Sequence, residues 1–224
     1  MICSGDRPVA PFTILSFTFQ RELGKPYLQG PLKLPRSFYE QPTIDVARQL
    51  VGKHLVRKHS DGITIGKIVE TEAYVGPEDR ACHASRGRTP RTEVMFGQPG
   101  HAYVYFIYGF HYMLNIVTER KDFPAAVLIR AVEPTEGISL MEIRRHTENV
   151  YNLASGPGKL CEAFAIDRSL NGADVCGRVI YLENAGEPVG KIIARPRIGV
   201  DYAGKWKHKP WRFLINGNKF VSKQ

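Results

Sequence analysis

Two neighbouring segments constrain the fold of this chain more than any others. The segment IVETEAY at 68–74 has the spacing of a strand, and side chains alternate between the two faces of a strand. Glu72 and Tyr74 therefore share a face, about 7 Å apart. The segment HAYVYFIYGFHYMLN at 101–115 predicts an aromatic hairpin that turns at Tyr108 and the glycine after it. A carboxylate beside aromatic rings in a basic chain favours chemistry on an extruded nucleobase.

Length and charge narrow the class of protein. The 224 residues suffice for one domain or at most two small ones, and 43% hydrophobic residues can form an ordinary core. The formal net charge is +9 and the sequence pI is about 9.4. This charge predicts an anionic partner, with nucleic acid as the first candidate and an anionic membrane as the second.

Cysteine usage and hydropathy favour an intracellular protein without a membrane segment. The four cysteines contain no C-x-x-C pair, so neither a zinc site nor a disulfide framework is indicated. No run approaches the 18 apolar residues of a membrane span. The apolar stretch at 11–19 lacks the basic flank and the cleavage site of a signal peptide.

The order of predicted elements favours a single mixed domain. Residues 1–30 are expected to form an N-terminal extension, read as a flexible arm, and residues 31–224 are expected to form the folded domain. Thr43 is a candidate N-cap of a helix that ends near Gly52, and a hairpin is expected around Asp61-Gly62. Further helices are expected at 137–146 and 158–166, and further strands at 103–118, 126–132 and 177–214. We predict an α+β fold: a curved antiparallel β-sheet flanked by helices, with a protruding β-hairpin.

Several motifs together resemble the alkyladenine (3-methyladenine) DNA glycosylase family. They are ETEAY at 70–74, GPEDRACH at 76–83, YVYFIYG at 103–109, Asn115, AVLIRAVEP at 126–134 and LASGPGKL at 153–160. They occur in the order of the family and span most of residues 36–213. The resemblance implies a monofunctional DNA glycosylase that starts base excision repair on double-stranded DNA, with no metal and no organic cofactor. Implied substrates are 3-methyladenine, 7-methylguanine, hypoxanthine and ethenoadenine, each flipped out of the duplex.

Glu72 is the first candidate for catalysis. Hydrolysis of an N-glycosidic bond needs a water made nucleophilic, and general base catalysis supplies about 10²–10⁴-fold. The resemblance implies that Glu72 activates this water, and Glu70 on the same face is read as structural. Arg130 interrupts an apolar strand, which favours a specific partner. That partner could be Glu72, or Glu133 or Glu136 in a structural ion pair. The resemblance implies that Arg130 contributes to the site of the water.

The candidate base pocket consists of Tyr74, His83, Tyr105 and Asn115. Aromatic stacking is worth about 1–3 kcal/mol per base and tolerates different bases. The resemblance implies that a purine lies between Tyr74 and Tyr105 with His83 at its edge, and that Asn115 excludes the amino group of normal guanine. Without the resemblance, these side chains would read as ordinary core residues.

The candidate DNA contacts follow the same reasoning. The resemblance implies that Tyr108 enters the duplex and fills the gap left by the flipped nucleotide. The loop residues Arg86, Arg88, Thr89 and Arg91 are expected to contact the backbone, as is Lys159 in the first turn of its helix. A cationic strip follows at 191–212, where lysines and arginines outnumber acids and tryptophans interleave. It comprises Lys191, Arg195, Arg197, Lys205, Lys207, Lys209 and Arg212 against Asp201.

Two other functions remain open on the sequence. Several acidic residues and one histidine lie close together in and just after the first motif. They would suit a metal-dependent nuclease or hydrolase that uses Glu70, Glu72, Glu78, Asp79 and His83. A catalytically silent module that binds damaged DNA is the second alternative. We expect a monomer, in the cytoplasm or nucleoid of a bacterium or the nucleus of a eukaryote.

Overall fold

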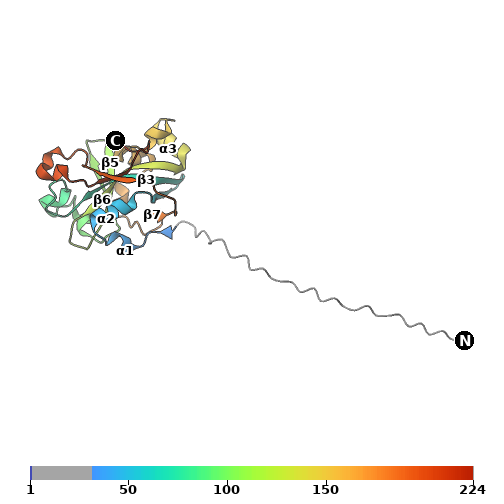
Figure 1. The fold of residues 1–224 in the computed structure, drawn as a ribbon, viewed down its shortest axis with the longest axis horizontal. Helices are drawn as coiled ribbons and strands as arrows, with labels where there is room; N and C mark the ends of the chain where they lie inside the picture. The colour runs from blue at the N-terminus through green and yellow to red at the C-terminus, as the bar shows by residue number, and fades with distance from the viewer. Residues whose placement is uncertain (2–31, 224) are drawn as a thin grey trace.

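The computed structural model describes residues 1 and 32–223, so the predicted extension lies, Met1 apart, outside the described residues (Figure 1). The helices are α1 (Arg36–Tyr39), α2 (Thr43–Leu50), α3 (Ile138–Arg145), α4 (Val150–Leu153) and α5 (Pro157–Ala163). Short 3₁₀ helices are η1 (His83–Arg86), η2 (Glu93–Phe96), η3 (Arg168–Leu170) and η4 (Asp201–His208). The strands are β1 (Leu32–Lys33), β2 (His54–His59), β3 (Gly62–Tyr74), β4 (Ala102–Ile107), β5 (His111–Val117), β6 (Ala126–Glu136), β7 (Ile180–Asn184), β8 (Ile192–Arg195) and β9 (Arg212–Ile215).

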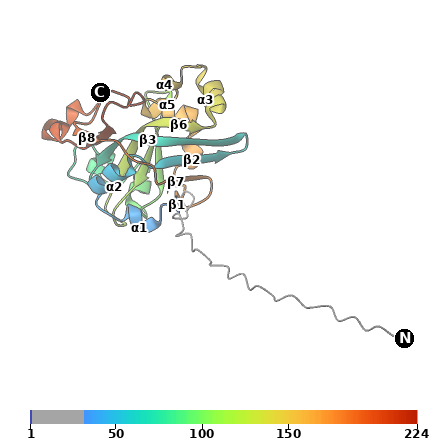
Figure 2. The same ribbon diagram turned by 45° about the vertical axis from the view of Figure 1, so that its right-hand side comes forward.

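The strands form one curved antiparallel sheet, which confirms the predicted α+β fold. Among the described residues the sheet has nine strands, in the order β1-β7-β2-β3-β6-β5-β4, and β9 joins β3 to β8. The predicted hairpins are both present: β2 and β3 turn at Ser60 and Asp61, one residue before the expected Asp61-Gly62, and β4 and β5 turn at 108–110. Figure 2 shows β2 and β3 running together as a long ribbon.

Strand β3 organises the sheet because its 13 residues are shared between two partners on one edge. Its first half pairs with β2, and Glu70, Thr71 and Glu72 pair with β9. On its other edge β3 pairs with β6, with register shifts around Glu70. A shift of this kind is a β-bulge, which re-aims side chains locally.

One face of the sheet carries the main core. Val127 and Ile129 of β6 and Leu114 of β5 pack there with α2 and α5. The hydroxyl of Thr71 donates to the carbonyl of Ala47 in α2 over 2.7 Å, which ties β3 to this helix.

The start of α2 differs from the prediction. Pro42 occupies the N-cap position and Thr43 is the first helical residue. The backbone N–H and the hydroxyl of Thr43 both donate to Glu119, so a distant carboxylate caps the helix instead of the threonine. The other expected helices are present as α3 and α5. No helix in the described part of the chain is long and apolar enough to cross a membrane.

Candidate active site

A row of paired residues crosses the sheet on the face opposite the main core. Tyr103 of β4 pairs with Asn115 of β5, Asn115 pairs with Leu128 of β6, and Leu128 pairs with Glu72 of β3. Directly paired residues project to the same side of a sheet. The register therefore gathers residues that are far apart in the sequence into one site.

A cavity of about 280 Å³ opens on this face. This is close to the lower end of the roughly 300–1,000 Å³ range of small-molecule sites. Its described lining is Tyr74, Ala81, Cys82, His83, Met95, Tyr103, Tyr105, Ile107, Tyr108, Met113, Asn115, Ala126, Leu128, Arg130, Pro157, Ile198, Gly199, Val200 and Tyr202. All predicted pocket residues are in this lining, together with Arg130 and Tyr108, whereas Arg88, Thr89 and Lys159 are not.

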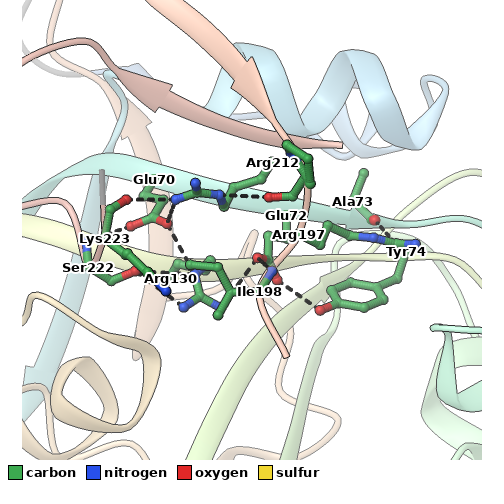
Figure 3. A network of polar contacts seen from close by, with 11 residues as sticks. Glu70, Glu72, Ala73, Tyr74, Arg130, Arg197, Ile198, Arg212, Ser222 and Lys223 are labelled. Atoms are coloured by element: carbon green, nitrogen blue, oxygen red, sulfur yellow. Dashed lines mark hydrogen bonds and ion pairs between the residues drawn. The ribbon is translucent and has the colours of Figure 1, made fainter. Parts of the chain in front are cut away.

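The carboxylate of Glu72 lies directly behind this lining and is fully buried. Its Oε1 accepts the backbone N–H of Ile198 over 2.8 Å and lies 3.3 Å from Nη1 of Arg130. Its Oε2 accepts the hydroxyl of Tyr74 over 2.8 Å (Figure 3). A buried charge is tolerated when it is paired and hydrogen-bonded, and Glu72 satisfies both conditions.

Glu70 lies beside Glu72 but has different partners. Its Oε1 accepts from Nε of Arg130 over 3.2 Å and from Nη1 of Arg212 over 2.9 Å (Figure 3). Its Oε2 accepts the backbone N–H of Ser222 over 2.7 Å. Arg130 thus bridges the two carboxylates, and the ion pair with Glu72, rather than one with Glu133, is present.

The strand irregularity explains how Arg130 reaches both acids. Glu70 pairs with Ala131 and Thr71 pairs with Ile129, so Arg130 falls between two pairs as the extra residue of β6. The bulge turns its guanidinium toward the buried acids. Burial by itself lowers the pKa of Arg130, but Glu72 and Glu70 outweigh it and the net shift is upward.

A second buried ion pair lies next to the ring of Tyr74. The guanidinium of Arg197 binds both oxygens of Asp79, at 2.5 and 2.8 Å, and neither side chain is exposed. The same guanidinium lies 4.8 Å from the ring centre of Tyr74. The sequence analysis did not predict this pair. Asp79 also accepts the N–H of Ala81 two residues on, a turn typical of aspartate.

An aromatic wall faces this acidic side of the cavity. The rings of His83 and Tyr105 meet edge to face at 4.5 Å, and Tyr103 lies 5.3 Å from Tyr105. Nδ1 of His83 is 3.1 Å from the hydroxyl of Tyr103. Burial, with smaller contributions from Arg91 and Arg86, lowers the pKa of His83 to about 4. The imidazole is therefore neutral at neutral pH and offers one donor and one acceptor.

Asn115 closes the floor between the two walls. Its side chain is 4% exposed, and its Nδ2 donates to the carbonyl of Tyr103 over 3.3 Å. This bond ties the amide to the neighbouring strand, so a ligand in the cavity meets a fixed polar group.

The hairpin tip overhangs the cavity. Tyr108 and Gly109 both have positive φ, 57° and 78°, so the predicted turn at these residues is confirmed. The side chains of Tyr108 and Phe110 are 75% and 68% exposed. Large apolar side chains this exposed are typical of a contact surface.

The predicted phosphate contacts are mostly engaged within the protein. Arg88 pairs with Asp122 at 2.5 Å and with Glu93 at 3.4 Å. Thr89 bonds to Thr92, and the ammonium of Lys159 donates to Asn152.

The expectation for the cationic strip needs correction at two positions. Arg197 and Arg212 are each 5% exposed and pair with Asp79 and Glu70 respectively, so they are not available to a phosphate. Local charge density could not reveal this, because both acids lie on β3 or just after it.

A basic depression beside the cavity includes three of the loop residues expected to contact the DNA backbone, Arg86, Thr89 and Arg91. It has a lining without acidic residues: Arg80, Cys82, His83, Ser85, Arg86, Thr89, Arg91, Thr92, Phe106, Ile107, Tyr108 and Tyr202. Cys82, His83 and Tyr108 line both hollows, so an anionic chain held here would pass the mouth of the cavity.

The acids proposed for metal binding do not converge. Within residues 32–223 no group of three or more His, Cys, Asp and Glu side chains has the spacing to hold a metal ion. Glu70 and Asp79 are instead bound by arginines.

A single α+β domain with a buried Glu–Arg pair behind an aromatic cavity has the layout of an enzyme. The model of the methylpurine-DNA glycosylase family matches residues 37–219. A protein of Methanocella arvoryzae is 56% identical over 193 residues, covering 85% of this chain and 96% of its own length. Proteins of Carboxydothermus hydrogenoformans and Desulfitobacterium hafniense are 49% and 45% identical over 85% of this chain, and 99% and 98% of their own lengths. All three carry the provisional name 3-methyladenine DNA glycosylase.

The chain belongs to the methylpurine-DNA glycosylase family. It is a DNA glycosylase, an enzyme that hydrolyses the N-glycosyl bond of a nucleotide in DNA.

Proposed function

We propose that this enzyme holds a damaged purine, flipped out of duplex DNA, in the aromatic cavity and releases it with a water activated by Glu72. The substrates would be 3-methyladenine, 7-methylguanine, hypoxanthine and ethenoadenine. One observation carries the proposal: the buried carboxylate of Glu72 is hydrogen-bonded to Tyr74 and ion-paired with Arg130, and both of these line the cavity.

The hydrogen bonds of Glu72 leave room for a water. A carboxylate has about four acceptor positions, two on each oxygen. Oε1 accepts the N–H of Ile198 and forms the ion pair with Arg130, whereas Oε2 accepts the hydroxyl of Tyr74. The remaining position on Oε2 is where Glu72 would accept a proton from water.

In the proposed step, the water oxygen bonds to C1′ of the sugar as the bond to the base breaks. The bonding electrons leave with the base, and the water gives its proton to Glu72. A cationic methylpurine departs as a neutral base, whereas a neutral purine also needs a proton. The ionised carboxylate additionally stabilises the positive charge that develops on the sugar.

Recognition of the base would rest on stacking and exclusion. Tyr74 and Tyr105 both line the cavity, and a planar base would stack between them. His83, neutral at neutral pH, presents hydrogen-bonding groups at the edge of the base. Asn115 would exclude the exocyclic amino group of normal guanine.

The DNA surface would combine the hairpin tip and the basic depression. Tyr108 would occupy the gap left in the duplex, and Arg80, Arg86 and Arg91 would bind the backbone on either side of the flipped nucleotide. No lysine lines the cavity among the described residues, which favours simple hydrolysis that leaves the strand intact over an amine-linked lyase step.

The test is base release from duplexes carrying a single hypoxanthine or ethenoadenine, with EDTA present, by the wild type and Glu72→Gln. We expect the wild type to release base and leave an abasic strand that breaks in alkali. Glu72→Gln should bind the duplex and lose nearly all turnover. Retained activity in Glu72→Gln would remove this residue from its role. Binding without release by the wild type would favour the silent module, and activity only with added metal would favour the hydrolase.

A further inference from the structure

The C-terminal residues reach the buried acid–arginine cluster. The N–H of Ser222 donates to Glu70, and its Oγ lies 3.2 Å from Nη2 of Arg130 (Figure 3). The next carbonyl, of Lys223, accepts from Nη1 of Arg212 over 2.8 Å. Val221 is 9% exposed and packs into the main core, which anchors the tail just before these contacts.

The tail follows the segment that the family model matches. The model matches residues 37–219, and the contacts begin at Ser222. The proposed machinery of Glu72 and Arg130 is thus held in part by the last residues that the structure describes.

The three nitrogens of Arg130 share three acceptors. Nη1 lies 3.3 Å from Glu72, and Nε lies 3.2 Å from Glu70. Oγ of Ser222 lies 3.2 Å from Nη2 and 3.4 Å from Nε. Among the described residues, Ser222 is the acceptor available to Nη2. Arg130 is 8% exposed, so an Nη2 without this acceptor would have little water to replace it.

The guanidinium is planar, so its donors move together. A buried donor that loses its acceptor costs free energy until it finds another. If Nη2 turned toward a new acceptor, Nη1 would leave its position against Oε1 of Glu72. The hydroxyl of Ser222 thereby fixes the plane of the Arg130 guanidinium, and this guanidinium in turn orients the carboxylate of Glu72.

We propose that Ser222 is a positioning residue of the active site: its hydroxyl holds Arg130 in the plane that orients Glu72. This inference rests on the proposed role of Glu72. The tail residue touches neither the cavity nor the DNA surface described above, so its effect passes through Arg130.

The test compares Ser222→Ala with Ser222→Thr, which keeps a hydroxyl, and with Ser139→Ala, an exposed serine of α3 as the matched control. Single-turnover base release is measured on a hypoxanthine duplex with enzyme in excess. Affinity is measured on a duplex carrying a tetrahydrofuran abasic analogue, and Tm by thermal unfolding. We expect Ser222→Ala to lower the rate about tenfold, equivalent to about 1.4 kcal/mol. Affinity should stay close to the wild type, Tm should fall by no more than about 2–4 °C, and Ser222→Thr should recover most of the rate.

Two results would overturn the inference. A wild-type rate in Ser222→Ala would show that the hydroxyl does not orient the site. A parallel fall of rate, affinity and Tm, with no recovery in Ser222→Thr, would show a purely structural role for the tail. Failure of the proposed function is distinguishable, because wild-type enzyme would then release no base or Glu72→Gln would remain active.

Discussion

Tyr74 donates its hydroxyl to Glu72 over 2.8 Å, although the two residues lie on the same strand with a single residue between them. Their shared face lets both side chains lean toward each other above the sheet. Burial, and next the charge of Glu72, raise the pKa of Tyr74 well above its usual value, so the phenol keeps its proton and remains a donor. The carboxylate is thereby held from its own strand as well as from Arg130 and Ile198.

Tyr74→Phe should therefore slow base release while keeping the stacking surface. A hydrogen bond to a charged group contributes about 1.5–3 kcal/mol, so we expect a loss of about tenfold or more in the single-turnover rate. The rate is measured on a hypoxanthine duplex, with affinity for an abasic analogue measured in parallel and expected to change little. Tyr151→Phe, at an exposed tyrosine outside the cavity lining, is the control. A wild-type rate in Tyr74→Phe would mean that the hydroxyl does not orient Glu72.

The sequence predicted the parts of this site that depend on local pattern. Alternation on β3 placed Glu72 beside Tyr74, and the glycine after Tyr108 predicted the hairpin turn. These features follow from strand geometry and turn chemistry within a few residues. The roles of these residues stay predictions, since they came from the family resemblance.

The partners that hold the acids could not be predicted in the same way. Arg197 lies 118 residues from Asp79, and Arg212 lies 142 residues from Glu70. No spacing rule links such positions. Arg212, for example, reaches Glu70 because β9 joins the edge of β3. The net charge of the chain correctly indicated an anionic partner. It could not distinguish arginines that pair with buried acids from arginines that remain available to DNA.

His83 predicts a pH dependence of stability. Its pKa falls from 6.5 to about 4 on folding, mainly through burial. Between pH 6.5 and pH 4, His83 is therefore protonated in the unfolded chain but neutral in the folded chain. The free energy of unfolding accordingly decreases as the pH falls from about 6.5 to about 4. The largest loss that this single group allows is about 3 kcal/mol.

The pH dependence is measured by urea unfolding at several pH values for the wild type and His83→Gln. We expect the variant to lose less stability than the wild type between pH 6.5 and 4, by up to the amount given above. His208→Gln, at an exposed histidine, should follow the wild type and serves as the control. Parallel curves for His83→Gln and the wild type would contradict the assigned shift.

Tyr108 should act on flipping and leave the fold unchanged. Its side chain is 75% exposed, and asparagine tolerates the positive φ at this position, so Tyr108→Asn should keep the wild-type Tm. Stacking in the duplex gap is worth about 1–3 kcal/mol, so the flipping equilibrium should fall about tenfold. The fluorescence of ethenoadenine in a duplex reports flipping, and Tyr108→Phe, which keeps the ring, should restore it. An unchanged signal in Tyr108→Asn would argue against the wedge.

The salt dependence of binding distinguishes free arginines from engaged ones. If about five phosphates are contacted, log K should fall with log salt with a slope of about −4 to −5. Arg86→Gln, in the basic depression, should reduce the magnitude of this slope by about 1. Arg88→Gln should change it less, because Arg88 already pairs with Asp122 and Glu93. The measurement is affinity for an undamaged duplex from low to moderate salt. A larger effect at Arg88 than at Arg86 would mean that DNA displaces these acids and that the loop, rather than the depression, follows the phosphate backbone.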